Sequence, residues 1–314
     1  IGVEPLPDID FNIRCGNTLV GFASFEELNE VLSSKIDISG TEQVIRQKCD
    51  DLARVYSEFI SSQLKSDHDG AGQAKSRLLA DLQKLNRTLN INIIDSIYEN
   101  AVGNSSVSKW EQEVKPFHWI TQFYTVIIDG GFDVIIGNPP YVEYRPRNFN
   151  YSVSQYKTKA CGNLYAYCVE RVYQITKPDA FIAMIIPLSG FSTSRMQPLT
   201  ENLVSESRSL HVSFLSGDAN PAILFEGVKF RLSIFVSQRG GSADYISTTR
   251  YVRWYARART ELFQALFYRT HKAQQNRIPK IDSEIDMVFS LATQSMPIIS
   301  KVITNGEFDI YYHN

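Results

Sequence analysis

The residues of this sequence best suited to chemistry are Asn138, Pro139, Pro140 and Tyr141, which directly follow the apolar run 134–136 and Gly137. An apolar run without alternation predicts a strand that is covered on both faces of a parallel sheet. The two prolines donate no backbone hydrogen bond and keep Asn138 out of the helical region, so the strand must end there. The motif is therefore predicted to form a stiff loop at the carboxyl end of a strand, where open α/β sheets bind their ligands.

These four residues suit a reaction at an amine attached to a nucleobase. Such an amine is a poor nucleophile because its lone pair is conjugated with the ring. The Asn138 side-chain oxygen and the Pro139 backbone carbonyl can accept its two hydrogens, which moves the nitrogen towards a tetrahedral geometry. Tyr141 offers a flat face to a base that has left its stack. An ordinary turn is the alternative, because Asn and Pro are common in turns.

The motif resembles a known family when it is taken together with Pro116-Phe-His-Trp119 and the run 130–137 before it. It is similar to the catalytic motif of adenine-specific DNA methyltransferases, in particular those of the type IIG and related restriction–modification enzymes. The resemblance covers most of the chain from about Leu6 to about Arg239. It implies transfer of a methyl group from S-adenosylmethionine to a flipped adenine in duplex DNA. It also implies that Phe225 wedges against that adenine, although a phenylalanine is more commonly a core residue.

The same resemblance assigns four residues to the cofactor. Asn17, expected at the end of a short strand over residues 10–15, would bind the adenine ring of S-adenosylmethionine, with Thr18 beside it. Leu164 and Cys168 would pack on its methionine end, although relatives often carry an aromatic residue at the second position. A Gly-rich loop following a strand is not found. In relatives it lies upstream of the position where this chain begins, so we expect a fragment with an incomplete site that binds the cofactor weakly and has little activity alone.

Two basic stretches are candidates for contact with DNA. The net charge of −2 shows no overall basic character, so any footprint must be local. Cations interleaved with aromatic rings are typical of nucleic-acid surfaces. The first stretch has four cations and no acid between its ends: Arg145, Arg147, Lys157 and Lys159. The second, residues 239–280, has nine Lys or Arg against two acids and includes Arg250, Arg253 and Arg257. A solvated loop and a solvated helix with an apolar stripe over 262–267 are the alternatives.

The predicted fold class is α/β: a partial Rossmann-like methyltransferase sheet with helices on both faces and a helical-hairpin insertion. Helical spacing of apolar residues predicts the hairpin, with one helix from about Thr41 to Leu64, a break over 67–72, and a second from about Ala74 to Ile97. Three regions are expected: a catalytic core over 1–23 and 116–245, the insertion over 24–115, and over 246–314 a basic connector with the start of a target-recognition domain.

Composition limits the remaining possibilities. No apolar run approaches a membrane span, and the start is neither a signal peptide nor a natural Met, so a cytoplasmic fragment is expected. The four cysteines and five histidines show no metal-binding spacing, and His118 is expected to serve packing rather than base catalysis. Expected partners are double-stranded DNA and upstream and downstream parts of the same polypeptide or a specificity module. Two alternatives stay open: a methyltransferase acting on RNA or protein glutamine, and a non-catalytic DNA-binding or interaction module.

Overall fold

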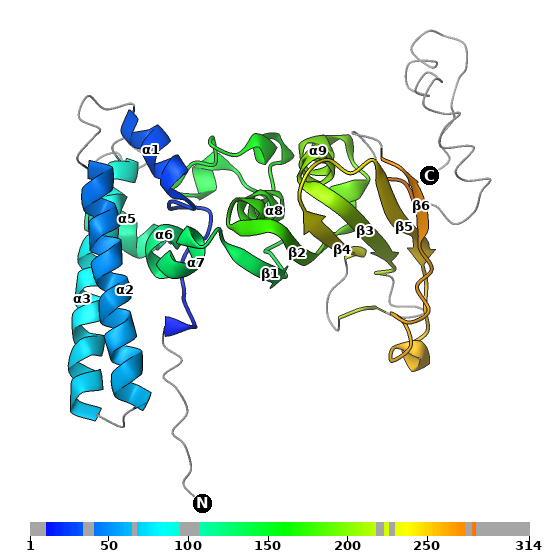
Figure 1. Ribbon diagram of the computed structural model, residues 1–314. Helices are drawn as coiled ribbons and strands as arrows, with labels where there is room; N and C mark the ends of the chain where they lie inside the picture. Colours follow the sequence, from blue (N-terminus) through cyan, green and yellow to red (C-terminus); the bar gives the residue numbers. More distant parts are fainter. Residues whose placement is uncertain are drawn as a thin grey trace, which may run out of the picture.

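The computed structural model describes residues 11–33, 41–64, 68–94, 107–217, 223–225, 230–273 and 278–280. It is a mixed α/β structure in which a six-stranded sheet is flanked at one end by a long helical hairpin (Figure 1). This confirms the predicted fold class at that level.

The hairpin is made by α2 (Thr41–Leu64) and α3 (His68–Ile93), which pack along each other (Figure 1). Buried residues at helical spacing on both helices form this contact, as the sequence predicts. The two helices are separate, as predicted, but the predicted position of the break over 67–72 is wrong, because α2 ends at Leu64 and α3 already begins at His68. Gly72 faces open space in the early turns of the helix, and a glycine there costs only about 1 kcal/mol, which packing of the hairpin offsets.

Four shorter helices connect the hairpin to the sheet: α1 (Phe25–Ser33), α5 (Val107–Val114), α6 (Trp119–Gln122) and α7 (Tyr124–Ile128). Ser24 and Glu27 cap the start of α1: the Glu27 amide donates to Ser24 Oγ at 3.3 Å, and the Ala23 amide donates to the Glu27 carboxylate at 2.6 Å. The strand expected over residues 10–15 is not found from Phe11 onwards. Asn17 instead makes an isolated bridge to Pro116.

The sheet has the strand order β1-β2-β4-β3-β5-β6. Its strands are β1 (Phe132–Gly137), β2 (Thr176–Pro187), β3 (Ser207–Leu215), β4 (Leu232–Arg239), β5 (Tyr245–Val252) and β6 (Arg269–Lys272). The pairs β1–β2 and β3–β5 are parallel, and the other three pairs are antiparallel. Among the described residues between β3 and Leu232, none forms a strand. The apolar stripe over 262–267 forms turns and irregular chain rather than the helix considered from the sequence.

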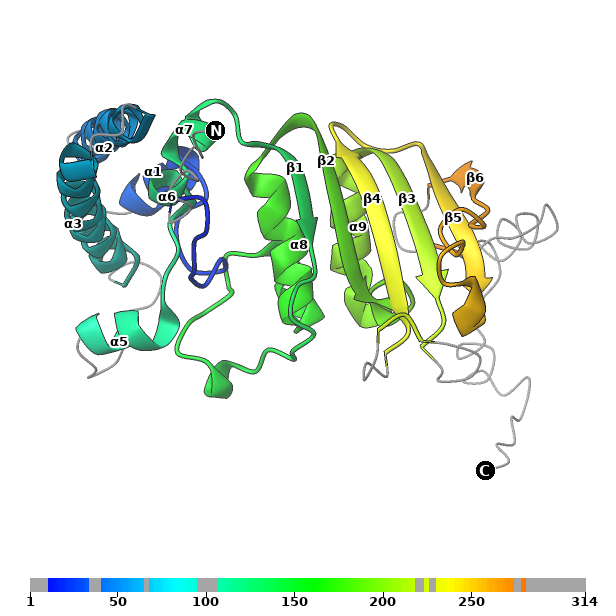
Figure 2. The ribbon, with the colours of Figure 1, turned by 90° about the horizontal axis from the view of Figure 1, so that it is seen from below.

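Two helices lie on the same face of this sheet: α8 (Leu164–Gln174), which connects the parallel strands β1 and β2, and α9 (Gln197–Glu206), which precedes β3. Seen from below, the strands lie in front of α9 (Figure 2). Alternate residues of β2 from Ala180 to Ile186 are buried on this side, and they form the main core with α8. A period-two burial pattern is what a strand with one covered face produces.

The opposite face of β1 and β2 is exposed within the described structure. Val134 is 56%, Ile136 80% and Phe181 50% accessible to solvent, and Val134 pairs with Phe181 across the strands. The prediction that the apolar run 134–136 is covered on both faces is therefore wrong for the part of the chain described. A continuous apolar run indicates that both faces of a strand are suited to burial. It does not indicate which part of a protein covers each face.

Candidate active site

The Asn138–Tyr141 loop stands at the carboxyl end of β1, as the sequence predicts. The Asn138 side chain is exposed, Pro139 is buried, and Tyr141 is partly buried. Asn138 therefore has open space beside its amide, which the predicted handling of a base amine requires. The buried Pro139 anchors the loop against the core, so the backbone carries the amide on a rigid support.

The Tyr141 hydroxyl joins the ends of the two parallel strands. It lies 2.7 Å from Asn138 Oδ1 and 3.0 Å from the backbone oxygen of Ile185 on β2. Its ring meets those of Tyr165 and Phe230 edge-on, with centroids 6.3 and 5.8 Å away. Burial raises the pKa of Tyr141, so the phenol keeps its proton at neutral pH.

Phe230, rather than Phe225, is the phenylalanine that packs against Tyr141. Phe225 is described and exposed, and its role as a wedge stays a prediction. Sequence reasoning missed Phe230, although its position just before β4 was a usable signal. The backbone oxygen of the next residue, Arg231, accepts a hydrogen bond from the Leu188 amide at 2.8 Å, which brings this segment to the end of β2.

The loop after Tyr141 contains an acid that offsets one of the predicted DNA-binding cations. Glu143 accepts hydrogen bonds from Arg145 at 2.7 and 3.1 Å and from Arg195 at 3.2 Å. Hydrogen bonds from Arg145 and Arg195 lower the pKa of Glu143. Arg195 also donates to the backbone oxygen of Gly162 at 3.1 Å. Glu143 lies two residues before the first basic stretch, which begins at Arg145, so the charge of that stretch alone does not include this acid.

The other cations of this loop are presented on ordered backbone. Arg147 lies in a 3-10 turn (Pro146–Asn148), and Lys157 and Lys159 lie in another (Lys157–Cys161); all three side chains are exposed. The buried Glu170 carboxylate accepts hydrogen bonds from the Lys157 amide at 2.9 Å and from the amide and hydroxyl of Thr158 at 2.9 and 2.7 Å. Glu170 therefore fixes the turn that carries the two lysines.

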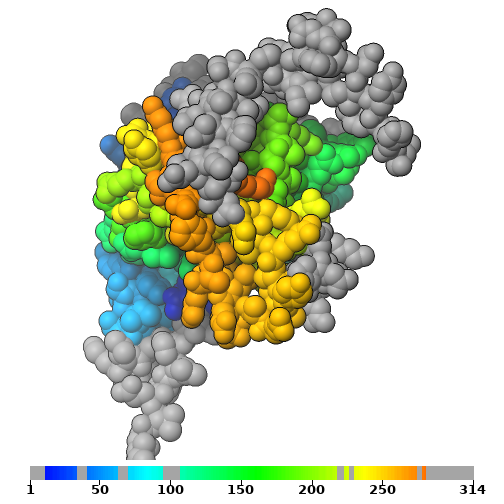
Figure 3. All heavy atoms as spheres, turned by 90° about the vertical axis from the view of Figure 1, so that its right-hand side faces the viewer, coloured from blue at the N-terminus to red at the C-terminus, as the bar shows by residue number. Residues whose placement is uncertain are grey.

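The second basic stretch lies at the other end of the sheet. Arg250 is on β5, Arg253 follows it, and Arg257 lies in the 3-10 turn Ala256–Ala258, over the ring of Tyr255. All three arginine side chains are exposed. Figure 3 shows the end of the molecule to which this part of the chain belongs, in yellow and orange. Because β2, β4 and β3 stand between β1 and β5, the structure does not bring the two basic stretches together (Figure 2).

Two of the residues assigned to the cofactor, Asn17 and Cys168, lie near Tyr151. Asn17 Oδ1 accepts a hydrogen bond from the Leu19 amide at 3.1 Å. Burial raises the pKa of Tyr151 to about 12, and the Asn17 side chain partly opposes that rise. Thr18 accepts from the indole of Trp119 at 3.3 Å. Burial raises the pKa of Cys168 to about 12, so it stays a neutral thiol.

This group of residues fits the predicted cofactor in two respects. An amide oxygen can accept two hydrogen bonds, so Asn17 Oδ1 has capacity left for an adenine amine. Asn163 Oδ1, beside Leu164 at the start of α8, is buried with no hydrogen-bond partner in the described structure, and it could accept from an ammonium group. Leu164 and Cys168 are both buried in the main core.

His118 anchors the structure and is not available as a base. Its Nδ1 accepts from the Phe22 amide at 3.2 Å, and its Nε2 lies 2.9 Å from Asn90 Oδ1 on α3. The ring is fully buried, and this burial, with the nearby Arg171, lowers the pKa of His118 to about 3. The neutral histidine thus connects α3 to the segment before α1.

A buried arginine, which the sequence did not single out, connects α8 to the same segment. Arg171 is 1% exposed; it donates to Glu27 at 2.9 and 3.3 Å and to the Tyr156 hydroxyl at 2.9 Å. Tyr156 in turn donates to the Leu19 backbone oxygen at 3.0 Å. These bonds hold the loop that carries Asn17 against the helix that carries Leu164 and Cys168.

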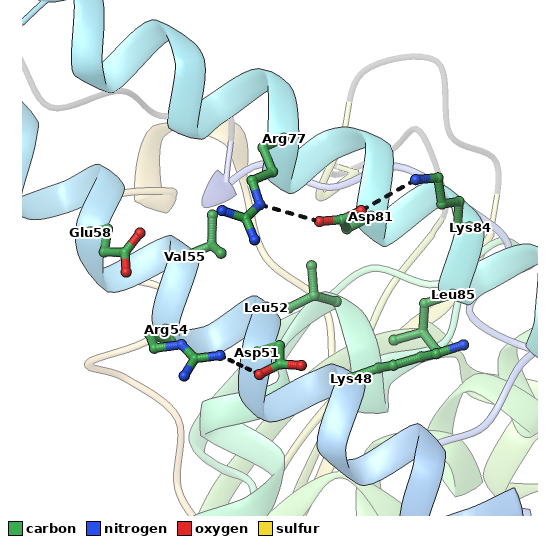
Figure 4. A pocket seen from close by; sticks show the side chains of 10 residues that line it. All are labelled: Lys48, Asp51, Leu52, Arg54, Val55, Glu58, Arg77, Asp81, Lys84 and Leu85. Atoms are coloured by element: carbon green, nitrogen blue, oxygen red, sulfur yellow. Dashed lines mark hydrogen bonds and ion pairs between the residues drawn. The ribbon is translucent and has the colours of Figure 1, made fainter.

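A groove of about 630 Å³ between α2 and α3 lies away from this site (Figure 4). Its walls mix cations and acids, and Arg77 and Lys84 both pair with Asp81 along one side. Among the described residues, no helix is long and apolar enough to cross a membrane, and no group of three or more His, Cys, Asp or Glu could hold a metal ion.

Comparison with known proteins identifies the class to which the fold and the Asn138–Tyr141 loop belong. A model of the Eco57I restriction-modification methylases matches residues 47–219, more than half of the chain. The chain belongs to the Eco57I restriction-modification methylase family. It is 25% identical over 244 residues to RM.MjaORFECS2P of Methanocaldococcus jannaschii, a protein named as a type II restriction enzyme and methyltransferase. That alignment covers 64% of this chain and 20% of the relative, so the chain spans about a fifth of its length.

Solved structures give more distant similarities. One is a nuclease-deletion mutant of the Type ISP restriction-modification enzyme LlaGI in complex with a DNA substrate mimic, 13% identical with a TM-score of 0.41, covering 52% of this chain and 17% of that one. Another is a DrdV–DNA complex, 16% identical with a TM-score of 0.38, covering 48% of this chain and 18% of that one.

Proposed function

We propose that this chain contributes the catalytic core of an adenine-specific DNA methyltransferase that uses S-adenosylmethionine in a restriction–modification system. The observation that carries the proposal is the exposed Asn138 amide on a proline-stiffened loop at the end of β1, with the Tyr141 ring beside it. In this proposal the Asn138 oxygen and the Pro139 carbonyl accept the two hydrogens of the adenine amine. Tyr141 stacks on the flipped base, which offsets part of the cost of leaving the duplex.

S-adenosylmethionine, when bound, supplies an electrophilic methyl group on a sulfonium. The residues of this chain that would hold it are Asn17 and Thr18 in the segment before α1 and Leu164 and Cys168 on α8. Their contribution is to bind and orient, because the neutral Cys168 thiol and the buried His118 offer no nucleophile or base. Transfer to the base amine would need no covalent bond to the enzyme: the cofactor would leave as its thioether, and the amine nitrogen would release one proton to solvent.

Exposed cations beside the loop support DNA as the substrate. Arg147, Lys157 and Lys159 extend from ordered turns near Tyr141, where they could contact phosphates on either side of a flipped base. Arg145 would contribute less, since Glu143 already neutralises it. Arg250, Arg253 and Arg257 would serve a separate contact further along the duplex, because they lie at the far end of the sheet.

The test is Asn138→Ala in the natural full-length protein. We expect methylation of duplex DNA to fall at least about 100-fold, because a positioned acceptor for the reacting amine is lost. DNA affinity should change little, because the phosphate contacts remain. The product is read as N6-methyladenine in digested DNA. Asn29→Ala on α1 serves as a control that keeps wild-type activity.

Three outcomes would contradict the proposal. Methylation activity that is retained in Asn138→Ala would contradict the proposed role of Asn138. Methyl transfer to RNA or to protein glutamine in preference to DNA would change the substrate. Full binding of DNA with no methylation by the wild-type protein would favour a non-catalytic DNA-binding module.

A further inference from the structure

The Tyr141 hydroxyl lies within hydrogen-bonding distance of two oxygens, Asn138 Oδ1 at 2.7 Å and the Ile185 backbone oxygen at 3.0 Å. A phenol carries a single proton and can donate it fully to only one of them. Both neighbours are acceptors in this arrangement, so one of the two oxygen–oxygen contacts has no proton. The Asn138 oxygen that the proposed reaction needs is also occupied by the hydroxyl.

A half-turn of the Asn138 amide resolves both conflicts. The turn exchanges Oδ1 and Nδ2, which have nearly the same shape but opposite hydrogen-bonding character. Nδ2 then donates to the Tyr141 oxygen, and the Tyr141 proton goes to Ile185. Oδ1 then points to the exposed side of the loop, where a base amine would lie.

We propose that the Tyr141 hydroxyl is a positioning group that selects which end of the Asn138 amide faces the substrate. It accepts a hydrogen bond from Nδ2 and donates its proton to the Ile185 carbonyl, so the amide oxygen is held towards the amine. This role is separate from stacking by the Tyr141 ring, and it rests on the proposed function of Asn138.

The surroundings of Tyr141 suit such a role. Ile185 pairs with Ile234 of β4 in the middle of the sheet, so its carbonyl is a fixed acceptor. Tyr165, itself buried, and Phe230 hold the Tyr141 ring from two sides. Because the pKa of Tyr141 is raised by burial, the hydroxyl remains a donor throughout the neutral range.

The experiment removes the hydroxyl and keeps the ring. In the natural full-length protein, Tyr141→Phe should lower kcat for methylation of duplex DNA about tenfold, the rate equivalent of one neutral hydrogen bond. KM for DNA and the fluorescence of 2-aminopurine at the target position should stay unchanged, because stacking is retained. Tyr56→Phe is the matched control and should keep the wild-type kcat, since Tyr56 lies on α2, where its ring packs on Phe11 and Phe59 away from the site.

Asn138→Asp separates orientation from simple support of the loop. The two oxygens of a carboxylate are equivalent, so no turn can misplace the acceptor. If the hydroxyl orients the amide, Tyr141→Phe should have little further effect on kcat in the Asn138→Asp background. A tenfold loss there as well would overturn the proposal and leave the hydroxyl as a support for the loop through Ile185.

A spectroscopic measurement tests the same contact without relying on turnover. In protein labelled with ¹⁵N-asparagine and bound to duplex DNA, the side-chain NH₂ signal of Asn138 is identified by its loss in Asn138→Asp. It should shift in Tyr141→Phe and not in Tyr56→Phe. An unchanged signal would overturn the positioning role even if the protein methylates adenine, whereas a wild-type protein that methylates no adenine would contradict the proposed function instead.

Discussion

At the scale of single residues, the candidate site combines one exposed polar side chain with buried side chains that carry no charge. Asn138 is exposed, whereas His118 and Cys168 are buried and held neutral. In other proteins histidine and cysteine side chains act as bases or nucleophiles because their charge state can change near neutral pH. Here burial removes that property, so the proposed reaction would depend on hydrogen-bond acceptors rather than on proton transfer by a side chain.

The buried His118 gives a prediction for stability. Its pKa is about 3 in the folded protein and about 6.5 in the unfolded chain, so the unfolded state takes up a proton first as the pH falls. The contribution of His118 to the free energy of unfolding is therefore fully present above about pH 6.5. Between about pH 6.5 and about pH 3 this free energy falls by about 1.4 kcal/mol per pH unit. His118→Gln should remove this component from urea unfolding measured between pH 7.5 and 5.

The exposed His211 on β3 provides the control, because His211→Gln should keep the wild-type dependence of the unfolding free energy on pH. An His118→Gln protein that loses stability as steeply as the wild type below pH 6.5 would show that the histidine is not the group responsible.

At the scale of elements, the ion pair between α1 and α8 predicts a large effect from a small change. Glu27→Ala would leave the buried Arg171 without its carboxylate partner, and an uncompensated buried charge costs about 3–5 kcal/mol. The free energy of unfolding in urea should fall by about that amount. Glu30→Ala, an exposed acid on the same helix, should leave it nearly unchanged. Equal stability of the two variants would mean that Arg171 is solvated in solution.

Elements with strong local signals could be predicted from the sequence, and those specified by tertiary contacts could not. The Asn138–Tyr141 loop follows from the fixed backbone of proline, and the α2–α3 hairpin follows from apolar periodicity. Strand β5 escaped prediction because its buried residues Ser247, Thr248 and Thr249 are polar and carry no hydropathy signal. Their cost of burial is offset by partners far along the chain: Thr249 accepts from the Phe214 amide, and Thr248 bonds His271.

The same distinction applies within the candidate site. The sequence indicated Asn138, Tyr141 and the exposed lysines, because the residues next to them in the chain form recognisable motifs with them. It missed Phe230, Arg195 and Arg171, whose partners are 89, 52 and 144 residues away (Tyr141, Glu143 and Glu27). Only a folded chain brings such pairs together, so spacing alone gives no indication of them.

At the scale of the whole molecule, the exposed side of β1 and β2 predicts association of this chain. An apolar surface formed by Val134, Ile136 and Phe181 favours contact with other protein surfaces. Ile136→Lys should lower the fraction of dimers and larger species measured by light scattering at high concentration. Val44→Lys, which replaces an isolated exposed residue on α2, should not. The same association in both variants would show that this face is not the contact surface.

The position of β4 between β2 and β3 has a consequence for how the protein is made. On a ribosome β3 emerges before β4, yet β3 meets β2 only through β4. The half of the sheet with β1 and β2 and the half with β3 and β5 therefore cannot join until synthesis has passed Arg239. Until then the nascent chain presents β2 with an open edge, and the β3–β4 pair joins it as the step that closes the sheet.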